Sequence, residues 1–208
     1  RVRSSAASDV YKRQIPARTD NLIVSDKAIS VSNLINGSTR VQPVVMLTGQ
    51  AAGTLAALAV KAGCTPREVP VRRLQAALLA QKAYLQPLYD VKPDDPDFGL
   101  LQRIASTGIL RMTGEPYQWA NRSWFYPERT VSVGEFTLGL HDYAPQIAVE
   151  DDPAPLTAAS AADLLRRAGG RIAPSADTTP LTRREAARMV DEALHPFERD
   201  IDFDGNLK

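Results

Sequence analysis

Small side chains at helical spacing mark the part of the chain best suited to bind a ligand. Residues 37–60 read GSTRVQPVVMLTGQAAGTLAALAV and carry no charge after Arg40. One face of the helix expected here would consist of Gly49, Ala52, Gly53, Ala56 and Ala57. A face this small lets a neighbour approach the helix backbone closely. That neighbour could be a sheet, another helix or a flat cofactor.

The same run is long enough to cross a membrane, since residues 41–60 form an uncharged stretch of 20 residues. Its content argues against a span, because it contains four polar residues and a proline: Gln42, Pro43, Thr48, Gln50 and Thr54. No tryptophan or tyrosine flanks it, as an interfacial belt would. We therefore predict a buried helix and no membrane span.

Composition excludes several other classes of function. The chain has 25 basic and 24 acidic residues and a net charge of +1, which provides no electrostatic footprint for nucleic acid or anionic lipid. Cys64 is the single cysteine, so neither an internal disulfide nor a thiolate metal cage can form. His141 and His195 are the only histidines and are far apart in the sequence, so no catalytic triad is indicated.

The first 14 residues, RVRSSAASDVYKRQ, show no apolar period. The segment DVYKRQ is what the codons GAT GTG TAT AAG AGA CAG would encode, and it resembles the end of a transposase adapter used in sequencing libraries. We predict that residues 1–14 are a non-native tail, and exclude them from reasoning about the fold. The alternative is a disordered basic arm. On the adapter interpretation, the natural chain begins before Ile15 and an N-terminal part is missing.

The elements that would position the small residues follow from turn and capping signals. We expect a buried strand at Asp20–Ser25 and a turn at Asn36–Thr39. A helix over residues 43–62 should begin at Pro43 and end at Gly63. Thr65 and Glu68 form a predicted capping box, before a second helix near Val71–Tyr84.

The remaining chain divides into two similar passages. Residues 86–97, QPLYDVKPDDPD, are predicted to be a linker because they hold three prolines and four aspartates. Each passage then reads as a helix, a glycine turn, a loop and a second helix. The four helices are expected near Phe98–Ser106, from Ser132, near Ala158–Ala168 and near Thr182–Leu194. WANRSWFYPERT is predicted to be a loop, VEDDPAPLT a second linker and residues 200–208 a tail.

The segment DNLIVSDKAISVSNLINGSTRVQPVVMLTGQAAGTLAALAVKAG resembles the C-terminal end of the FAD-dependent oxidoreductases of the two-dinucleotide-binding-domain flavoprotein group. The resemblance covers about residues 15–85. It implies a last strand that returns to the flavin, then a glycine turn and a GQAAG helix. A helix N-terminus would suit the pyrophosphate or the N1/C2-carbonyl edge of the flavin.

This resemblance implies FAD as the cofactor and a set of neighbouring residues: Asp26, Gly37, Ser38, Thr39, Arg40, Gly49, Gln50, Ala51, Ala52 and Gly53. Arg40 would stabilise reduced flavin, although it could equally be a surface residue beside a helix. Two departures matter. Ser25-Asp26-Lys27 stands where many relatives have a glycine-containing AGR, so Asp26 could contact ribityl hydroxyls. The chain also lacks a GxGxxG, which we expect in the missing N-terminal FAD-binding part.

The second half resembles S-layer homology repeats. The first passage carries Tyr89-Asp90-Val91, Gly108-Ile109-Leu110, Phe125 with Pro127, and Glu135; the second carries Leu164-Leu165, Ile172 and LTRREAA. In that family a TRAE-like motif at a helix start helps to bind cell-wall polymer. The first copy, TVSVGEF, lacks the arginine, and two repeats are visible where three usually make the binding unit. We therefore favour a structural appendage, and fold resemblance alone does not carry function.

Together these observations predict a mainly α chain: a C-terminal strand–helix piece of an FAD-binding domain, followed by a helical repeat domain at residues 98–199. The parent protein is expected to be an FAD-dependent oxidoreductase acting on a small molecule, and its catalytic residues are not indicated. The alternative is a non-catalytic module that binds the cell surface or cell-wall polymer, which would place it outside the cytoplasm. The ending DIDFDG resembles the opening of a calcium loop but lacks the twelfth-position acid, so we expect no metal.

Overall fold

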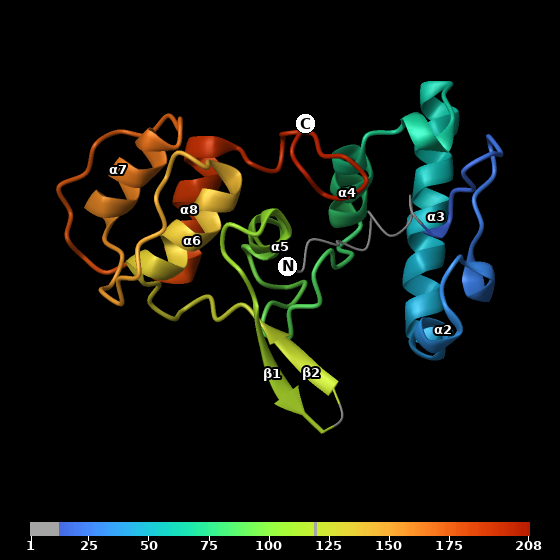
Figure 1. The fold of residues 1–208 in the computed structure, drawn as a ribbon, viewed down its shortest axis with the longest axis horizontal. Helices are drawn as coiled ribbons and strands as arrows, with labels where there is room; N and C mark the ends of the chain where they lie inside the picture. The colour runs from blue at the N-terminus through green and yellow to red at the C-terminus, as the bar shows by residue number, and fades with distance from the viewer. Residues whose placement is uncertain (1–12, 119) are drawn as a thin grey trace. The chain divides into compact units, whose positions relative to one another are not determined.

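The computed structural model describes residues 13–118 and 120–208, and it divides the chain into two compact units. The N-terminal unit comprises the chain up to Leu85 together with Asp200–Lys208, and the C-terminal unit comprises Gln86–Arg199. The described residues form seven α-helices, two short 3-10 helices and one two-stranded sheet (Figure 1). The prediction of a mainly α chain is confirmed.

The N-terminal unit is built on one long helix. In chain order its elements are η1 (Asp26–Ala28), α2 (Asn33–Thr39), α3 (Gln42–Ala62), η2 (Pro66–Glu68) and α4 (Val71–Ala80). The long helix α3 has the predicted limits, with proline in its first turn and Gly63 at φ 64° as its C-cap. The predicted capping box is also present, since the Thr65 N–H donates to Glu68 Oε2 at 2.7 Å. Helix α4 ends at Ala80 instead of Tyr84, because Lys82 adopts a left-handed φ of 60°.

Two predictions for the segment before α3 are wrong. Residues 20–25 form no strand; the Val24 N–H donates to Gln14 O at 2.7 Å, but no neighbouring strand in the described chain provides a continuous ladder. The expected turn at residues 36–39 is the second half of α2 instead. Ser32 starts that helix, because its hydroxyl accepts from the Ile35 N–H at 3.3 Å.

Helix α3 is less buried than its sequence predicts. Its buried residues are four small or aliphatic ones, Ala51, Ala52, Leu55 and Ala59. Met46 is 74% exposed and Val60 is 81% exposed, so the expectation of a buried helix is wrong for this unit by itself. The elements of the unit that pack against α3 are chiefly α4, η1 and η2. Among the described residues, α3 is the one helix long and apolar enough to cross a membrane by length and composition.

The last nine residues belong with the N-terminal unit. Ile201 is buried and pairs with Leu207 in an isolated bridge. Asp202 Oδ1 accepts from the N–H groups of Asp204 and Asn206, both at 2.8 Å. The segment that resembles a calcium loop is therefore a turn closed by its own hydrogen bonds. The described residues hold no cluster of acids, histidines or cysteines arranged for a metal ion.

The C-terminal unit contains the four predicted helices and one hairpin. Its elements are α5 (Phe98–Thr107), β1 (Thr113–Tyr117), β2 (Ala120–Trp124), α6 (Val133–Tyr143), α7 (Ala158–Arg167) and α8 (Arg183–Leu194). Residues 120–124, predicted to lie in a loop, instead form strand β2 and pair with β1 in a hairpin. Figure 1 shows this hairpin extending away from the helices of the unit. The fully buried core gathers side chains from the helices and the loops between them: Phe98, Leu101, Ile104, Ile109, Leu110, Phe125, Phe136, Leu140, Leu156 and Leu165.

Residues 86–97 are packed into this unit and are not an exposed linker. Gln102 brackets the Gln86 backbone, with Oε1 accepting from the Gln86 N–H at 2.9 Å and Nε2 donating to Gln86 O at 3.0 Å. Leu88 and Val91 are 2% and 0% exposed. The two carboxylate oxygens of Asp90 accept hydrogen bonds from the N–H groups of Phe125 and Tyr126, at 2.9 and 2.6 Å. The prolines and aspartates thus shape an ordered entry to α5.

Three helices of the C-terminal unit begin at one ring of backbone hydrogen bonds. The Val131 N–H donates to Leu181 O, the Leu181 N–H to Leu156 O, and the Leu156 N–H to Val131 O, at 3.2, 2.8 and 2.8 Å. The next residue in each segment is an N-cap, namely Ser132 for α6, Thr157 for α7 and Thr182 for α8. These positions recur at equal intervals of 25 residues, and the second predicted linker contributes Leu156 to the ring.

Candidate functional site

The glycines of α3 lie on a face that the unit leaves open. Residues three or four apart share one side of a helix, so Gly49 and Gly53 fall in line with Met46, Ala56 and Val60. We call these five residues the open face of α3. A Cβ added at Gly53 would meet no atom within 4 Å, and one added at Gly49 would meet Ser25 Oγ at 3.9 Å. The open face therefore has room for close approach of a flat group at Gly53, while Ser25 stands beside Gly49.

Other predicted cofactor neighbours on α3 point elsewhere. Ala51 and Ala52 are 4% and 7% exposed and are buried within the unit. The Gln50 side chain donates from Nε2 to Gln81 Oε1 at 3.0 Å, just beyond α4. The structure therefore does not bring these three residues together with Gly49 and Gly53 on one face. The small-residue composition of GQAAG does not distinguish the open side from the packed side.

The polar residues expected around the flavin lie at the N-terminal end of α3. Gly37, Ser38 and Thr39 are the last residues of α2, and Arg40 is its C-cap. The side chains of Ser38 and Arg40 are exposed. Because α3 begins at Gln42 and a helix rises 1.5 Å per residue, Gly49 lies about 10 Å further along the axis. The helix terminus and the glycine face are therefore two separate parts of the predicted site.

Few donors are available at the N-terminus of α3. Pro43 has no N–H, and the N–H groups of Val44 and Val45 both donate to Val41 O at 3.1 Å. The predicted binding of a pyrophosphate at this end accordingly loses most of the usual first-turn donors. Space beside α3 is left open further along the helix, at Gly53.

Asp26 lies beside the glycine face. It opens η1 with a left-handed φ of 63°, and its side chain is exposed. The preceding residue, Ser25, is the neighbour that an added Cβ at Gly49 would meet. A carboxylate at this position can accept hydrogen bonds from hydroxyl groups of a ligand that lies along α3.

Comparison with known proteins finds a family model that matches this part of the chain. Residues 11–78 match the model of the FAD dependent oxidoreductase family. The match spans all ten residues predicted to be near the flavin, and it supports an FAD-dependent oxidoreductase part within this chain. No curated protein and no solved structure matches the sequence.

The match begins at residue 11 and so includes the last four residues of the predicted adapter tail. Residues 1–12 of that tail lie outside the described part of the structure. The adapter interpretation therefore stays a prediction. The match ends at residue 78, before the C-terminal unit begins. The resemblance of that unit to S-layer homology repeats likewise stays a prediction.

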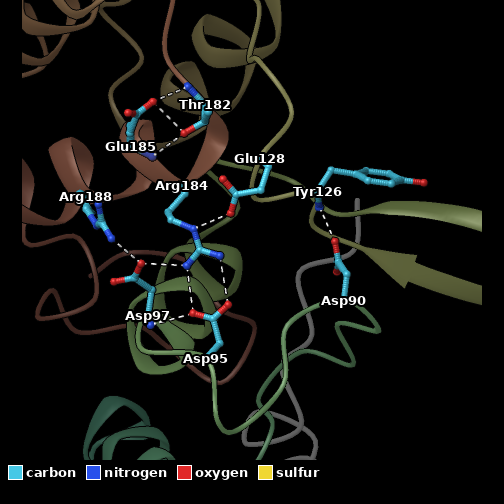
Figure 2. A network of polar contacts seen from close by, with 9 residues as sticks. All are labelled: Asp90, Asp95, Asp97, Tyr126, Glu128, Thr182, Arg184, Glu185 and Arg188. Atoms are coloured by element: carbon cyan, nitrogen blue, oxygen red, sulfur yellow. Dashed lines mark hydrogen bonds and ion pairs between the residues drawn. The ribbon is translucent and has the colours of Figure 1, made fainter.

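The LTRREAA motif of the C-terminal unit is engaged inside the unit. Arg184 reaches three carboxylates, donating to Asp95 at 2.9 Å, Asp97 at 2.8 Å and Glu128 at 2.8 Å (Figure 2). Arg188, one turn along α8, adds a bond to Asp97 at 2.6 Å. The hydrogen bonds to its carboxylate partners, first among them Asp95, raise the pKa of Arg184. The same hydrogen bonds with Arg184 are the main reason that the pKa values of Asp95 and Asp97 are lowered.

The other members of the motif also have structural roles. Arg183 is fully buried, and Thr182 and Glu185 form a capping box at the start of α8. The hydrogen bonds from the Thr182 N–H and hydroxyl lower the pKa of Glu185. Figure 2 shows the charged groups of this network directed toward one another. The motif therefore fastens α8 to the segment before α5, and nothing in these contacts supports binding of cell-wall polymer.

The network around Arg184 predicts a specific acid sensitivity. A carboxyl whose pKa is lower in the folded state than its usual 3.8 stabilises the fold above that value, and this stabilisation is lost as the pH falls through the lower folded pKa. We expect Asp97→Asn to lower the free energy of unfolding at pH 7 by about 1–3 kcal/mol. The variant should also lose less stability than the parent as the pH falls below the usual aspartate pKa of 3.8.

Urea denaturation followed by circular dichroism across this pH range measures both effects. Asp163→Asn is the matched control, because Asp163 pairs on the surface of α7 with Arg166 at 3.2 Å. Parallel acid profiles for the parent and Asp97→Asn would contradict the prediction.

Proposed function

We propose that residues 15–85 are the C-terminal piece of the FAD-binding domain of an FAD-dependent oxidoreductase. The observation that carries this proposal is the family match at residues 11–78, which contains the open face of α3. The parent enzyme would act on a small molecule, whose identity and reacting groups no residue here indicates. An upstream part of the same protein would supply the GxGxxG that binds the ADP half of FAD.

In this proposal each region of the site has a physical role. Gly49 and Gly53 admit the flavin ring, since side chains there would occupy its space. Arg40 and Ser38 stand toward the polar edge of the ring, where a positive charge stabilises added electron density. Asp26 accepts from ribityl hydroxyls. A bound flavin supplies hydride and electron-transfer chemistry, and the residues of this chain orient it and tune its charge.

The open face of α3 has a second consequence for the intact protein. Met46 and Val60 are large apolar side chains at 74% and 81% exposure, and both lie on the same face as the glycines. Apolar surface of this kind is stabilised by burial at roughly 25 cal/mol per Å². We propose that the flavin covers the middle of this face and that the upstream part of the domain covers its ends.

Replacing Gly53 by valine in the full-length protein tests the proposal. We expect the variant to fold and to lose most of its flavin, because a branched side chain would fill the space above the open face. Absorbance near 450 nm relative to protein measures flavin content, and circular dichroism reports folding. Gly99→Val on α5 is a control for the cost of valine in a helix, since it lies outside the matched segment.

Three outcomes separate the possibilities. Loss of flavin in Gly53→Val with retention in Gly99→Val supports the proposed site. Equal flavin content in both variants would show that the open face meets only protein. A full-length parent without flavin and without an upstream GxGxxG would overturn the proposed function itself.

A further inference from the structure

The C-terminal ends of three helices border a pocket in the C-terminal unit. Its volume is about 390 Å³, and it lies between the last residues of α6, the turn after α7 and the end of α8. Its principal lining residues are Tyr143, Ala168, Arg171, Leu194, His195 and Arg199. Ligand pockets typically measure roughly 300–1,000 Å³, so this volume suits a small organic molecule. The proposed flavin site lies in the other unit, and the network around Arg184 lies at the opposite end of α8.

The charge of the pocket lining is one-sided. Three of the lining residues, Arg171, His195 and Arg199, are basic, and no lining residue is acidic among the described residues. The chain as a whole has a net charge of only +1, so this concentration is local. A concave surface lined by one sign of charge focuses its field and attracts ions of the opposite sign. The three helix C-termini at the pocket contribute partial negative charge, so the three basic side chains are what would attract an anion here.

Two contacts give the pocket a defined wall. The Arg199 guanidinium lies 5.0 Å from the centroid of the Tyr143 ring, a cation–π distance that holds it beside the end of α6. The Arg171 N–H donates to Ala193 O at 2.9 Å, which ties the segment after α7 to the end of α8. These contacts locate the Arg171 backbone and the Arg199 guanidinium at the pocket.

The turn between Arg167 and Arg171 fits closely against α8. A Cβ added at Gly170 would lie 2.9 Å from Leu165 O and 3.0 Å from Leu194 Cδ2, so the close approach requires glycine. His195 is the C-cap of α8 with a left-handed φ of 43° and ψ of 49°, a conformation uncommon for residues with a side chain. The backbone conformation at the end of α8 therefore determines that His195 lies at the pocket.

A purely structural role would explain only part of this arrangement. Basic side chains near a helix C-terminus compensate the helix dipole, and this could account for Arg171 and His195. Arg199 lies outside every helix and stacks on the ring at the end of α6. Three basic residues converge on one pocket from two segments, Arg171 from the chain after α7 and His195 and Arg199 from the chain after α8, and the helix dipole does not account for Arg199.

We propose that this pocket binds a small organic anion that carries a carboxylate or phosphate group. Arg171, His195 and Arg199 supply the donors for the oxyanion, and charge-assisted hydrogen bonds of this type are among the strongest in proteins. Tyr143, Ala168 and Leu194 supply an apolar wall for the rest of the molecule.

Inorganic phosphate and citrate are the probes that test the proposal, each added to the 208-residue chain at constant ionic strength set with sodium chloride. Amide chemical shifts in two-dimensional NMR spectra locate binding, and titration gives the dissociation constants. We expect saturable shifts at the pocket residues for at least one probe. Arg171→Gln and Arg199→Gln should each weaken binding about tenfold, which corresponds to about 1.4 kcal/mol.

The matched control is Arg166→Gln, which removes the same charge from a neighbouring exposed site on α7 that pairs with Asp163. Binding of phosphate alone assigns a phosphoryl ligand, binding of citrate alone assigns a carboxylate, and either supports the proposal. An equal loss in Arg166→Gln and Arg171→Gln would show non-specific charge attraction and overturn it. The absence of saturable shifts up to tens of millimolar probe would overturn it as well.

Discussion

Replacing Gly139 with alanine should destabilise the C-terminal unit by about 3 kcal/mol or more. Gly139 is buried in α6, where the helix crosses directly over the backbone of Ile109. A Cβ at this position would lie 2.7 Å from the Ile109 carbonyl carbon and closer still to its oxygen. The obstruction is backbone, and Ile109 is itself 0% exposed, so neither side can move without opening the core.

Gly99→Ala in α5 is the matched control. Its added Cβ would meet only the Arg103 side chain, at an ordinary distance of 3.7 Å. Because glycine in a helix costs roughly 0.5–1 kcal/mol relative to alanine, this substitution should stabilise the unit by a similar amount. Urea unfolding of the parent and both variants, followed by circular dichroism, measures the three free energies. Equal stability of Gly139→Ala and the parent would show that α6 does not approach residue 109 this closely.

The elements that the sequence predicts correctly are those specified by local signals. Helix α3 begins at a proline and ends at Gly63, and α8 carries its own capping box from Thr182 to Glu185. Such signals act within three or four residues, so a single sequence contains them completely. The predicted limits of α3, α5, α7 and α8 are therefore within one or two residues of those observed.

The wrong predictions concern features that depend on distant partners. Residues 20–25 have the composition of a strand, but a strand needs a neighbour with which to pair, and the described chain provides none. The segment at residues 86–97 has the composition of a linker. Its aspartates instead bind groups that lie 35 to 91 residues further along the chain, such as the Phe125 N–H and Arg188. No local pattern indicates that an aspartate has such a partner.

The candidate flavin site shows the same limit. Residue order and spacing predict an FAD-dependent oxidoreductase part, and the family match at residues 11–78 supports it. Spacing did not reveal that Ala51 and Ala52 are packed inside the unit while Gly53 faces outward. That distinction depends on which residues of α3 the rest of the unit covers. Gly53, Met46 and Val60 are therefore the residues of α3 that the unit leaves accessible.

Among the charged residues of the C-terminal unit, Arg183 is the one whose replacement should lower the free energy of unfolding most. A positive charge in the first turn of a helix opposes the helix dipole, and burial adds a desolvation cost that lowers the pKa of Arg183 to about 10. Its partners offset these costs. Nε donates to Phe125 O and Nη2 donates to Arg111 O, both at 2.6 Å, and the guanidinium pairs with Glu135.

These bonds join four segments of the unit at one side chain. Phe125 follows the hairpin, Arg111 follows α5, and Glu135 lies in the first turn of α6. The guanidinium also lies 4.7 Å from the centroid of the Phe125 ring. Planar, fixed donors are needed to serve two carbonyls and a carboxylate at once, so lysine cannot replace arginine here.

We expect Arg183→Met to lower the free energy of unfolding by about 3–5 kcal/mol, because it leaves the buried Phe125 carbonyl, the Arg111 carbonyl and the Glu135 carboxylate without this partner. Arg183→Lys should recover only a minor part of the loss. Arg166→Met on the exposed surface of α7 should change stability by no more than about 0.5 kcal/mol, since surface ion pairs contribute little. Thermal and urea unfolding of the four proteins provide the comparison. If Arg183→Met and Arg166→Met proved equally stable, the buried guanidinium would not be what joins α8 to the hairpin, α5 and α6.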